Sequence, residues 1–258
     1  RDNDLDFNIS FEKFWDNHKD VDQSHQKIIS IAQKTGLPKE TARRKIIYLV
    51  KNKHIKKGEK NKLYWEPVSE LKETYINIIK DQIKSLSKFI FEQAKFLEIP
   101  VQFSKIEKEL LNNYSYYWHH YLNVQLQYMK FWQMRLKDLE MLLIGLQTTI
   151  QTINFLSSKM PKAFDNFSLK EVPIEIDIKN ANISATSVSE ITGIPRATCI
   201  RKLEKYVRMK VLQKDKVNKR YYLNKSLEDQ ILLSNEGIQN TTNIFGQFSS
   251  VLLRSVAK

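Results

Sequence analysis

Two dense clusters of lysine and arginine are the residues in this sequence whose types and spacing suggest a chemistry. From Thr35 to Trp65, ten Lys and Arg residues stand against two Asp and Glu residues, a net charge of +8. From Thr192 to Tyr222 the numbers are again ten and two. Cationic side chains at this density suit contacts with phosphate groups, because each contact releases counterions from a nucleic acid. The sequence therefore predicts two separate segments that bind a polyanion.

The rest of the chain does not share this charge. The 258 residues include 42 Lys and Arg and 29 Asp and Glu, a net charge of +13. The two clusters account for +16, so the other 196 residues sum to −3. A general lysine bias, of the kind that AT-rich genomes produce, would spread the charge along the whole chain. Its concentration in two segments favours nucleic-acid binding over such a bias.

The two clusters are copies of one pattern. The run TGLP at 35–38 recurs as TGIP at 192–195, 157 residues later, and the match continues without a gap to Trp65 and Tyr222. Twelve of the 31 aligned positions are identical. The apolar, glycine and proline positions match as well as the lysines do, so composition alone does not explain the similarity. The chain therefore contains an internal repeat.

Each copy has the same expected layout of secondary structure. A short apolar helix comes first, at 28–33 and again at 187–191. Glycine then permits a tight turn, and proline fits the first turn of a second helix, which is expected to reach about Lys53 or Lys210. A short basic hairpin follows in both copies. Helix, turn, helix and basic hairpin is the layout of a winged helix-turn-helix domain.

At this point the sequence resembles a known family. The runs TGLPKETARRK and TGIPRATCIRK, which begin at Thr35 and Thr192, are similar to the turn and recognition helix of bacterial winged-helix regulators of the IclR and MarR kinds. The resemblance covers one such domain in each copy and not the whole chain. In these regulators the helix after the turn enters the major groove of DNA, where its exposed side chains meet base edges.

The resemblance also implies which residues contact double-stranded DNA. On the two recognition helices they are Lys39, Glu40, Thr41, Arg43 and Arg44, and then Arg196, Ala197, Thr198, Ile200, Arg201 and Lys202. On the two hairpins they are Lys56, Lys57, Lys60 and Lys62, and then Lys214, Lys216, Lys219 and Arg220. Arginine suits the O6 and N7 atoms of guanine, and threonine suits phosphate. Because Glu40 and Arg43 align with Ala197 and Ile200, we expect the copies to read different half-sites, or one to anchor while the other discriminates.

The segments outside the copies are expected to be helical. An amphipathic helix is predicted from Ser69 to Leu97. Ser104 and Glu107 have the spacing of a capping box that starts another helix, which is expected to run past Ile153 with a break near Asn112–Asn113. A further helix is predicted from Ser226 to about Val256.

Apolar residues near the end of the long central helix follow a heptad pattern. The eight heptad positions are Met129, Trp132, Leu136, Leu139, Leu143, Leu146, Ile150 and Ile153. A continuous stripe of this kind is typical of helices that pair along their length. These residues are therefore predicted to form the core of a helical bundle that joins two chains in a homodimer.

The predicted fold class is mainly α, with two winged helix-turn-helix domains flanking a helical bundle. The expected segments are a first winged domain at 1–68, a central dimerisation domain at 69–160, a second winged domain at 161–225 and a C-terminal helix at 226–258.

Other chemistry-bearing residues are better explained as core. The segment 114–121 contains four tyrosines, one tryptophan and two histidines, but adjacent His119 and His120 point to different faces of a helix and suit one metal ion poorly. An aromatic core is the preferred interpretation, and a pocket for a small-molecule effector is the alternative. Cys199 is the only cysteine, which excludes a disulfide, and its position suits a core residue better than a redox sensor. No metal or cofactor is predicted.

The sequence as a whole predicts a DNA-binding protein rather than an enzyme. It contains no glycine-rich phosphate loop, HExxH or GxSxG motif. The longest apolar run outside aromatic clusters, Met141 to Ile144, is far too short to span a bilayer, and no signal peptide is visible, so a cytoplasmic, nucleoid-associated protein is expected. The first prediction is a dimeric transcriptional regulator. The alternatives are a replication initiator or partition protein, and an adaptor whose winged domains bind protein.

Overall fold

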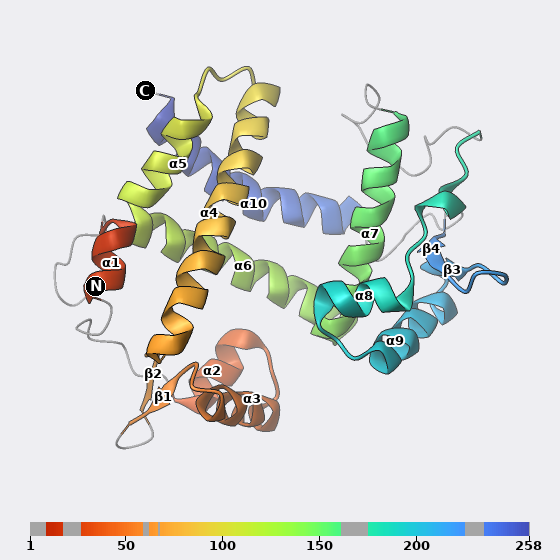
Figure 1. Cartoon of the computed structure of the whole chain (residues 1–258), viewed down its shortest axis with the longest axis horizontal. Coiled ribbons are helices and arrows are strands. Elements are labelled where there is room, and N and C mark those ends of the chain that lie inside the picture. Colours follow the sequence, from red (N-terminus) through yellow and green to blue (C-terminus); the bar gives the residue numbers. More distant parts are fainter. Residues whose placement is uncertain are drawn as a thin grey trace. The chain divides into compact units, whose positions relative to one another are not determined.

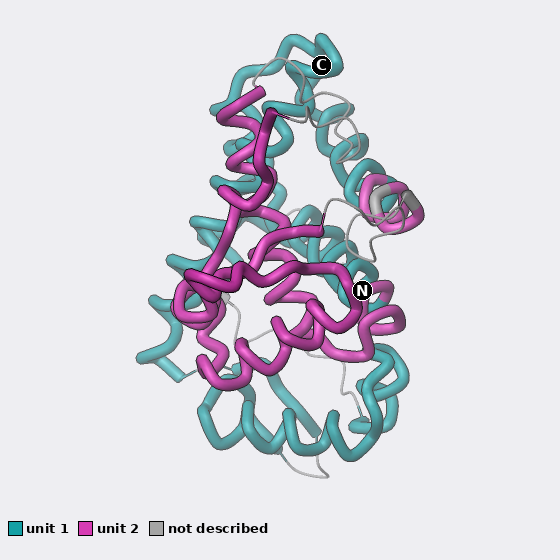
Figure 2. Tube along the Cα trace, turned by 90° about the vertical axis from the view of Figure 1, so that its right-hand side faces the viewer, with its two compact units in different colours: residues 1–130, 243–258 teal, residues 131–242 magenta. Residues whose placement is uncertain are grey.

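The computed structural model describes residues 9–17, 27–58, 62–66, 68–160, 175–224 and 235–257. Within these residues it contains ten α-helices, one 3-10 helix and two antiparallel sheets of two strands each (Figure 1). The mainly α fold class is therefore confirmed. The chain forms two compact units, residues 1–130 with 243–258 and residues 131–242, which Figure 2 colours separately. The predicted central segment 69–160 is shared between the units, because their boundary falls within a helix.

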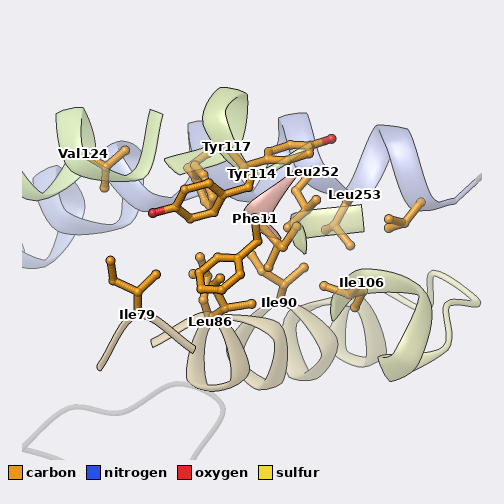
Figure 3. Packing of buried hydrophobic residues seen from close by; sticks show 14 of the residues in the cluster. Phe11, Ile79, Leu86, Ile90, Ile106, Tyr114, Tyr117, Val124, Leu252 and Leu253 are labelled. Atoms are coloured by element: carbon orange, nitrogen blue, oxygen red, sulfur yellow. The ribbon is translucent and has the colours of Figure 1, made fainter. Parts of the chain in front are cut away.

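A bundle of helices holds the core of unit 1. Its members are α1 (Phe11–Asn17), α4 (Ser69–Phe96), α5 (Phe103–Asn112), the part of α6 (Tyr114–Leu136) before residue 131, and the part of α10 (Asn235–Val256) from residue 243. The buried residues of α4 recur at steps of three and four, which places them on one face of the helix. In Figure 3, Leu86 and Ile90 from this face lie across the core from Phe11, Tyr114 and Leu252.

The aromatic segment 114–121 contributes to this core. Tyr114 and Tyr117 are buried, and the Tyr114 ring lies 5.1 Å from the ring of Phe11 and 5.5 Å from that of Trp118, measured between centroids. Burial raises the pKa of Tyr117 to about 12. His119 is exposed on the outer side of the helix. Tyr114 and Tyr117 therefore belong to the buried core of unit 1, as the sequence predicted, and an effector pocket elsewhere in the segment stays a prediction.

Unit 1 also holds the first copy of the repeat. It consists of helices α2 (Ile28–Thr35) and α3 (Lys39–Lys51) and of the paired strands β1 (Lys56–Lys57) and β2 (Leu63–Tyr64). On the described side chains of α2 and α3, the buried residues are Ala32, Ala42 and Ile46, which is the apolar face where the two helices meet. The two expected helices and the hairpin of this copy are present.

Unit 2 is built around α7 (Leu139–Lys159). Packed on it are the 3-10 helix η4 (Ile178–Ala181), helices α8 (Ala185–Thr192) and α9 (Arg196–Arg208), and the paired strands β3 (Leu212–Lys214) and β4 (Tyr221–Leu223). Ile183 forms a β-bridge with Tyr221, so the second copy of the repeat has an extra pairing beside its hairpin. One apolar cluster joins Leu156 of α7 to Ile178 and Tyr222.

The boundaries of the central helices agree only in part with the sequence prediction. α4 matches the predicted helix at 69–97, and the expected break near Asn112–Asn113 lies between α5 and α6. The predicted capping box is wrong, because α5 begins at Phe103, its N-cap is Gln102, and no side chain caps it. For the C-terminal helix, residues 226–234 lie outside the described part of the chain, and α10 begins at Asn235.

The single long helix past Ile153 is also wrong. α6 ends at Leu136 and α7 begins at Leu139, with Lys137 in the left-handed backbone region at φ 55°. The Asp138 carboxylate then caps α7 by accepting hydrogen bonds from the backbone N–H groups of Glu140 at 3.1 Å and Met141 at 3.3 Å. The apolar pattern gave no sign of this break, because its three- and four-residue spacing continues through it.

The heptad stripe is consequently divided between two helices and is unevenly buried. Trp132 and Leu136 on α6 are buried, whereas Met129 is exposed. On α7, Leu143 and Ile150 are exposed, and the remaining stripe residues Leu139, Leu146 and Ile153 are half-buried. A continuous coiled-coil seam over all eight positions is therefore corrected to two shorter stripes, because one straight helix does not carry them.

Candidate nucleic-acid interface

The two copies of the repeat have the same local structure. We call residues 28–66 the first copy and residues 185–224 the second copy. α2 and α8 begin and end at positions 157 residues apart, and so do α3 and α9. Gly36 and Gly193 occupy the turn at φ 71° and φ 68°, where a side chain would strain the backbone. After the second helix, Lys53 and Lys210 both have φ 60°.

The hairpins of the two copies differ by one residue in register. In the first copy Lys57 pairs with Leu63, and Gly58 donates its N–H to the carbonyl of Lys62 at 2.9 Å. In the second copy Lys214, which aligns with Lys57, pairs with Tyr221. Tyr221 aligns with Tyr64, one position after Leu63. The longer loop is held by the Asp215 carboxylate, which accepts hydrogen bonds from the backbone N–H groups of Val217 and Asn218. A one-residue shift turns side chains to the opposite face of the hairpin, so the two wings present different surfaces.

The predicted recognition face of the first copy is exposed on α3. Lys39, Glu40, Arg43 and Arg44 are exposed, and Thr41 is half-buried. Glu40 and Arg43, one helical turn apart, form a two-point ion pair: Nε of Arg43 lies 2.9 Å from Oε2 of Glu40, and Nη2 lies 2.8 Å from Oε1. The hydrogen bond from Arg43 lowers the pKa of the Glu40 carboxyl. On this face the carboxylate of Glu40 therefore sets the direction of the Arg43 guanidinium group.

The corresponding face of the second copy is simpler. Arg196, Ala197 and Arg201 are exposed on α9, while Thr198 and Ile200 are half-buried. Nε of Arg196 donates to Oγ1 of Thr186 on α8 at 3.0 Å. The structure thus places Arg44 and Arg201, which are identical in the repeat, at equivalent exposed positions.

Lys202 does not belong to this face, which corrects the sequence prediction. The residue is 7% exposed and its Nζ forms ion pairs with Asp138 and with Glu140, the latter at 3.1 Å. Asp138 is the N-cap of α7 and Glu140 lies in its first turn, where both carboxylates also balance the partial positive charge of the helix N-terminus. Lys202 is therefore a buried contact between α9 and α7 and is not available to a phosphate. Asp138 and Glu140 were missed because a separation of about sixty residues leaves no local sequence signal.

Tyr206 and Cys199 lie on the same buried side of α9. The hydroxyl of Tyr206 donates to the backbone carbonyl of Met141 on α7 at 2.7 Å. Cys199 is fully buried, and burial raises the pKa of its thiol. Burial and a raised pKa both disfavour the reactive thiolate, as expected for a core residue.

The basic residues of the hairpins are mostly on the surface. Lys56 and Lys57 are exposed, Lys62 is half-buried, and Lys60 lies outside the described residues. In the second copy Lys216, Lys219 and Arg220 are exposed. Nη1 of Arg220 donates to Oδ1 of Asn182, and Nζ of Lys219 donates to the carbonyl of Lys216.

Lys214 is the hairpin lysine with the firmest internal contact. Its Nζ lies 2.5 Å from Oε1 of Glu204 on α9, and the same oxygen accepts a hydrogen bond from the hydroxyl of Tyr221 at 2.7 Å. The hydrogen bond with Lys214 lowers the pKa of Glu204. Lys214 therefore fixes the hairpin to α9, which reduces the freedom of its side chain to contact another group.

A groove of about 630 Å³ opens beside the first copy. Its lining residues are Val50, Lys53, Ile55, Lys56, Lys57, Glu66, Val68, Ser69 and Glu70. In the second copy, the side-chain amide of Asn224 donates to the carbonyl of Lys210 at 2.9 Å and accepts from Gln213 at 2.7 Å.

No protein-family model, curated protein or solved structure matches this chain. Among the residues that the structure describes, none of the helices is both long and apolar enough to cross a membrane. The same residues contain no group of three or more His, Cys, Asp or Glu that could hold a metal ion.

Proposed function

We propose that this protein binds double-stranded DNA in a sequence-specific manner through two winged helix-turn-helix domains and regulates transcription. The observation that carries the proposal is the repeat itself. Two copies share a helix–turn–helix–hairpin geometry, and their aligned segments 35–65 and 192–222 each carry a net charge of +8 while the rest of the chain is slightly acidic. Two cationic copies in an otherwise slightly acidic chain suit a polyanion that is long enough to contact both copies.

The exposed arginines support the assignment of α3 and α9 as recognition helices. Arg44 and Arg201 hold equivalent exposed positions in the first half of each helix. Residues in this part of a recognition helix reach base edges when the helix lies in the major groove. The lysines of the hairpins would then contact phosphates, which adds affinity without adding sequence preference.

We further propose that two chains associate through α7. Leu143 and Ile150 are exposed and lie seven residues apart on the helix, beside the half-buried Leu146. The segment from Met141 to Ser158 contains no charged residue. An uncharged helix with an exposed apolar stripe favours a second copy of the same stripe as its partner.

A protein-binding adaptor is the second candidate, and one observation favours it. In the first copy Ile29, Ile47 and Tyr48 are 50%, 51% and 61% exposed. The aligned residues of the second copy are Thr186, Glu204 and Lys205, which are polar. Exposed apolar residues at these three positions of the first copy suit a protein partner there.

DNA binding is tested by the affinity of the full chain for labelled duplexes at several salt concentrations. The proposal predicts that affinity falls steeply as salt rises, because several phosphate contacts release counterions. Arg44→Ala and Arg201→Ala should each weaken binding by about tenfold, a loss within the range expected for an arginine–guanine contact. Arg254→Ala on α10 is the matched control, since it removes an exposed arginine outside both copies. Affinity that does not respond to salt, or equal effects of all three variants, would favour the adaptor.

A further inference from the structure

The ion pair between Glu40 and Arg43 distinguishes the recognition helix of the first copy from that of the second. Both side chains are exposed, at 63% for Glu40 and 53% for Arg43, so burial does not force them together. The aligned residues of α9 are Ala197 and Ile200, and the first turn of that helix has no acidic residue. The pair therefore occurs in one copy of a repeat whose helices begin and end at equivalent positions.

The geometry of the pair leaves half of the Arg43 fork free. Glu40 accepts hydrogen bonds from Nε and Nη2, which form one edge of the planar guanidinium group. The other edge, with Nη1 and the second N–H of Nη2, can still donate two hydrogen bonds. Two parallel donors are what O6 and N7 of guanine accept in the major groove. Glu40 thus leaves Arg43 able to read a guanine and fixes the direction in which its free edge points.

Glu40 also opposes unspecific binding. Its carboxylate adds a negative charge among Lys39, Arg43 and Arg44, close to where phosphates would approach. A negative charge there weakens attraction to any phosphate backbone, whatever the base sequence. A recognition helix with this pair consequently gains affinity mainly when the correct base pair accepts hydrogen bonds from the arginine.

We infer that Glu40 is the specificity-determining residue of the first copy, acting as a positioning residue for Arg43 toward one guanine of the target site. The inference rests on the proposed DNA binding and deepens it. The first copy discriminates between sequences through the pair, and the second copy, with Ala197 and Ile200, contributes affinity with less discrimination.

The test compares Glu40→Ala, Glu40→Gln and Arg43→Ala with the unchanged chain by selecting bound duplexes from a random pool and measuring affinity for a selected and an unselected duplex. Glu40→Ala and Arg43→Ala should lose preference at the same base pair, by about tenfold. Glu40→Ala should also bind unselected DNA about threefold more tightly, because a repulsive charge is gone. Glu40→Gln keeps an acceptor for Arg43 without the charge, so it should retain part of the preference and show the same gain on unselected DNA.

The control is Glu73→Ala, which removes an exposed glutamate from α4 and changes the net charge equally. If Glu40→Ala and Glu73→Ala select the same sequences with the same affinities, the inference is wrong while DNA binding stands. If the unchanged chain binds no duplex, DNA binding itself fails and takes the inference with it. The reverse variant, Ala197→Glu with Ile200→Arg, should create a new guanine preference in the part of the site read by the second copy.

Discussion

The first and second copies have the same helices and turns but are held in their units by different contacts. On α9 the residues Cys199, Lys202, Leu203 and Tyr206 are all buried, and the polar contacts of Lys202 and Tyr206 reach the first turn of α7. On α3 the aligned residues are Ala42, Lys45, Ile46 and Leu49. Of these four, Lys45 and Leu49 are exposed. A repeat can therefore fix local geometry while the neighbouring helix decides which positions are buried.

The first copy is attached to unit 1 through residues that follow its second helix, α3. Its hairpin leads into Trp65, whose ring lies 5.5 Å from that of Trp15 and 5.9 Å from that of Tyr75. Nδ1 of His54 also lies 2.8 Å from the hydroxyl of Tyr75. The first copy thus keeps much of α3 uncovered, whereas the second copy is fixed along α9 itself.

The largest expected difference between the copies concerns their apolar cores. Leu203→Ala should destabilise unit 2 by about 3 kcal/mol, because the side chain is fully buried and the surrounding helices cannot close the cavity. Ile46→Ala at the aligned position should cost less, about 2 kcal/mol, since α3 has fewer neighbours to lose. Amide hydrogen exchange of each copy measures both effects. Equal losses of protection would show that the two helices are packed to the same extent.

The buried lysine should give the next largest difference. Lys202→Ala leaves Asp138 and Glu140 without their partner and should destabilise unit 2 by about 2 kcal/mol, less than for a fully buried pair because both carboxylates keep contact with water. Lys45→Ala, at the aligned exposed position, should change stability by less than about 0.5 kcal/mol. Urea unfolding of the two variants compares them directly. A similar cost for both would contradict the different anchoring of the copies.

A smaller effect is expected at the hydroxyl of Tyr206. Tyr206→Phe keeps the ring but removes the donor to the Met141 carbonyl, which should cost about 1 kcal/mol. Tyr48→Phe on the exposed face of α3 is the matched control and should be neutral. The measurement is the thermal unfolding midpoint of each variant, compared with that of the unchanged chain. An unchanged midpoint for Tyr206→Phe would mean that water replaces the lost donor.

The smallest effect is a pH dependence that arises at Asp138, the N-cap of α7 that pairs with Lys202 of the second copy. Burial acts to raise the pKa of Asp138, but the hydrogen bonds from Lys202 and the backbone N–H groups of α7 prevail, and the folded pKa lies below the ordinary value. Its stabilising contribution is therefore complete above about pH 4, the unfolded pKa of aspartate, and is lost as the pH falls through the lower folded value.

Asp138→Asn tests this dependence because asparagine still caps a helix but carries no charge. The stability difference between the unchanged chain and the variant should be constant from pH 7 to about pH 5 and should shrink below about pH 4. A difference that stays constant to pH 2 would show that the carboxylate charge contributes nothing.

The copies also show which features could be predicted from the sequence. The turns at Gly36 and Gly193 and the four helices around them follow from local residue types, so they were found where the sequence placed them. The burial of Lys202 was not predictable, because it depends on Asp138 and Glu140 far away in the sequence. The different hairpin register depends on the loop held by Asp215, which hydropathy patterns do not reveal.

The same contrast applies to the central helices. The face of α4 was predictable because its apolar spacing begins and ends with the helix. The break at Lys137 was not, because a capping aspartate and one left-handed residue interrupt the backbone without interrupting the apolar spacing. Sequence patterns report faces of helices more reliably than they report where one helix ends and the next begins.

Selection of bound duplexes from a random pool, followed by sequencing, tests the central claim most directly. Two readers with different recognition helices should enrich a composite site with two unlike half-sites. One half-site should lose its sequence preference in Arg44→Ala and the other in Arg201→Ala, while Arg254→Ala should select the composite site unchanged. No enrichment over the starting pool, or a site that neither recognition-helix variant alters, would contradict the account of two DNA-reading copies.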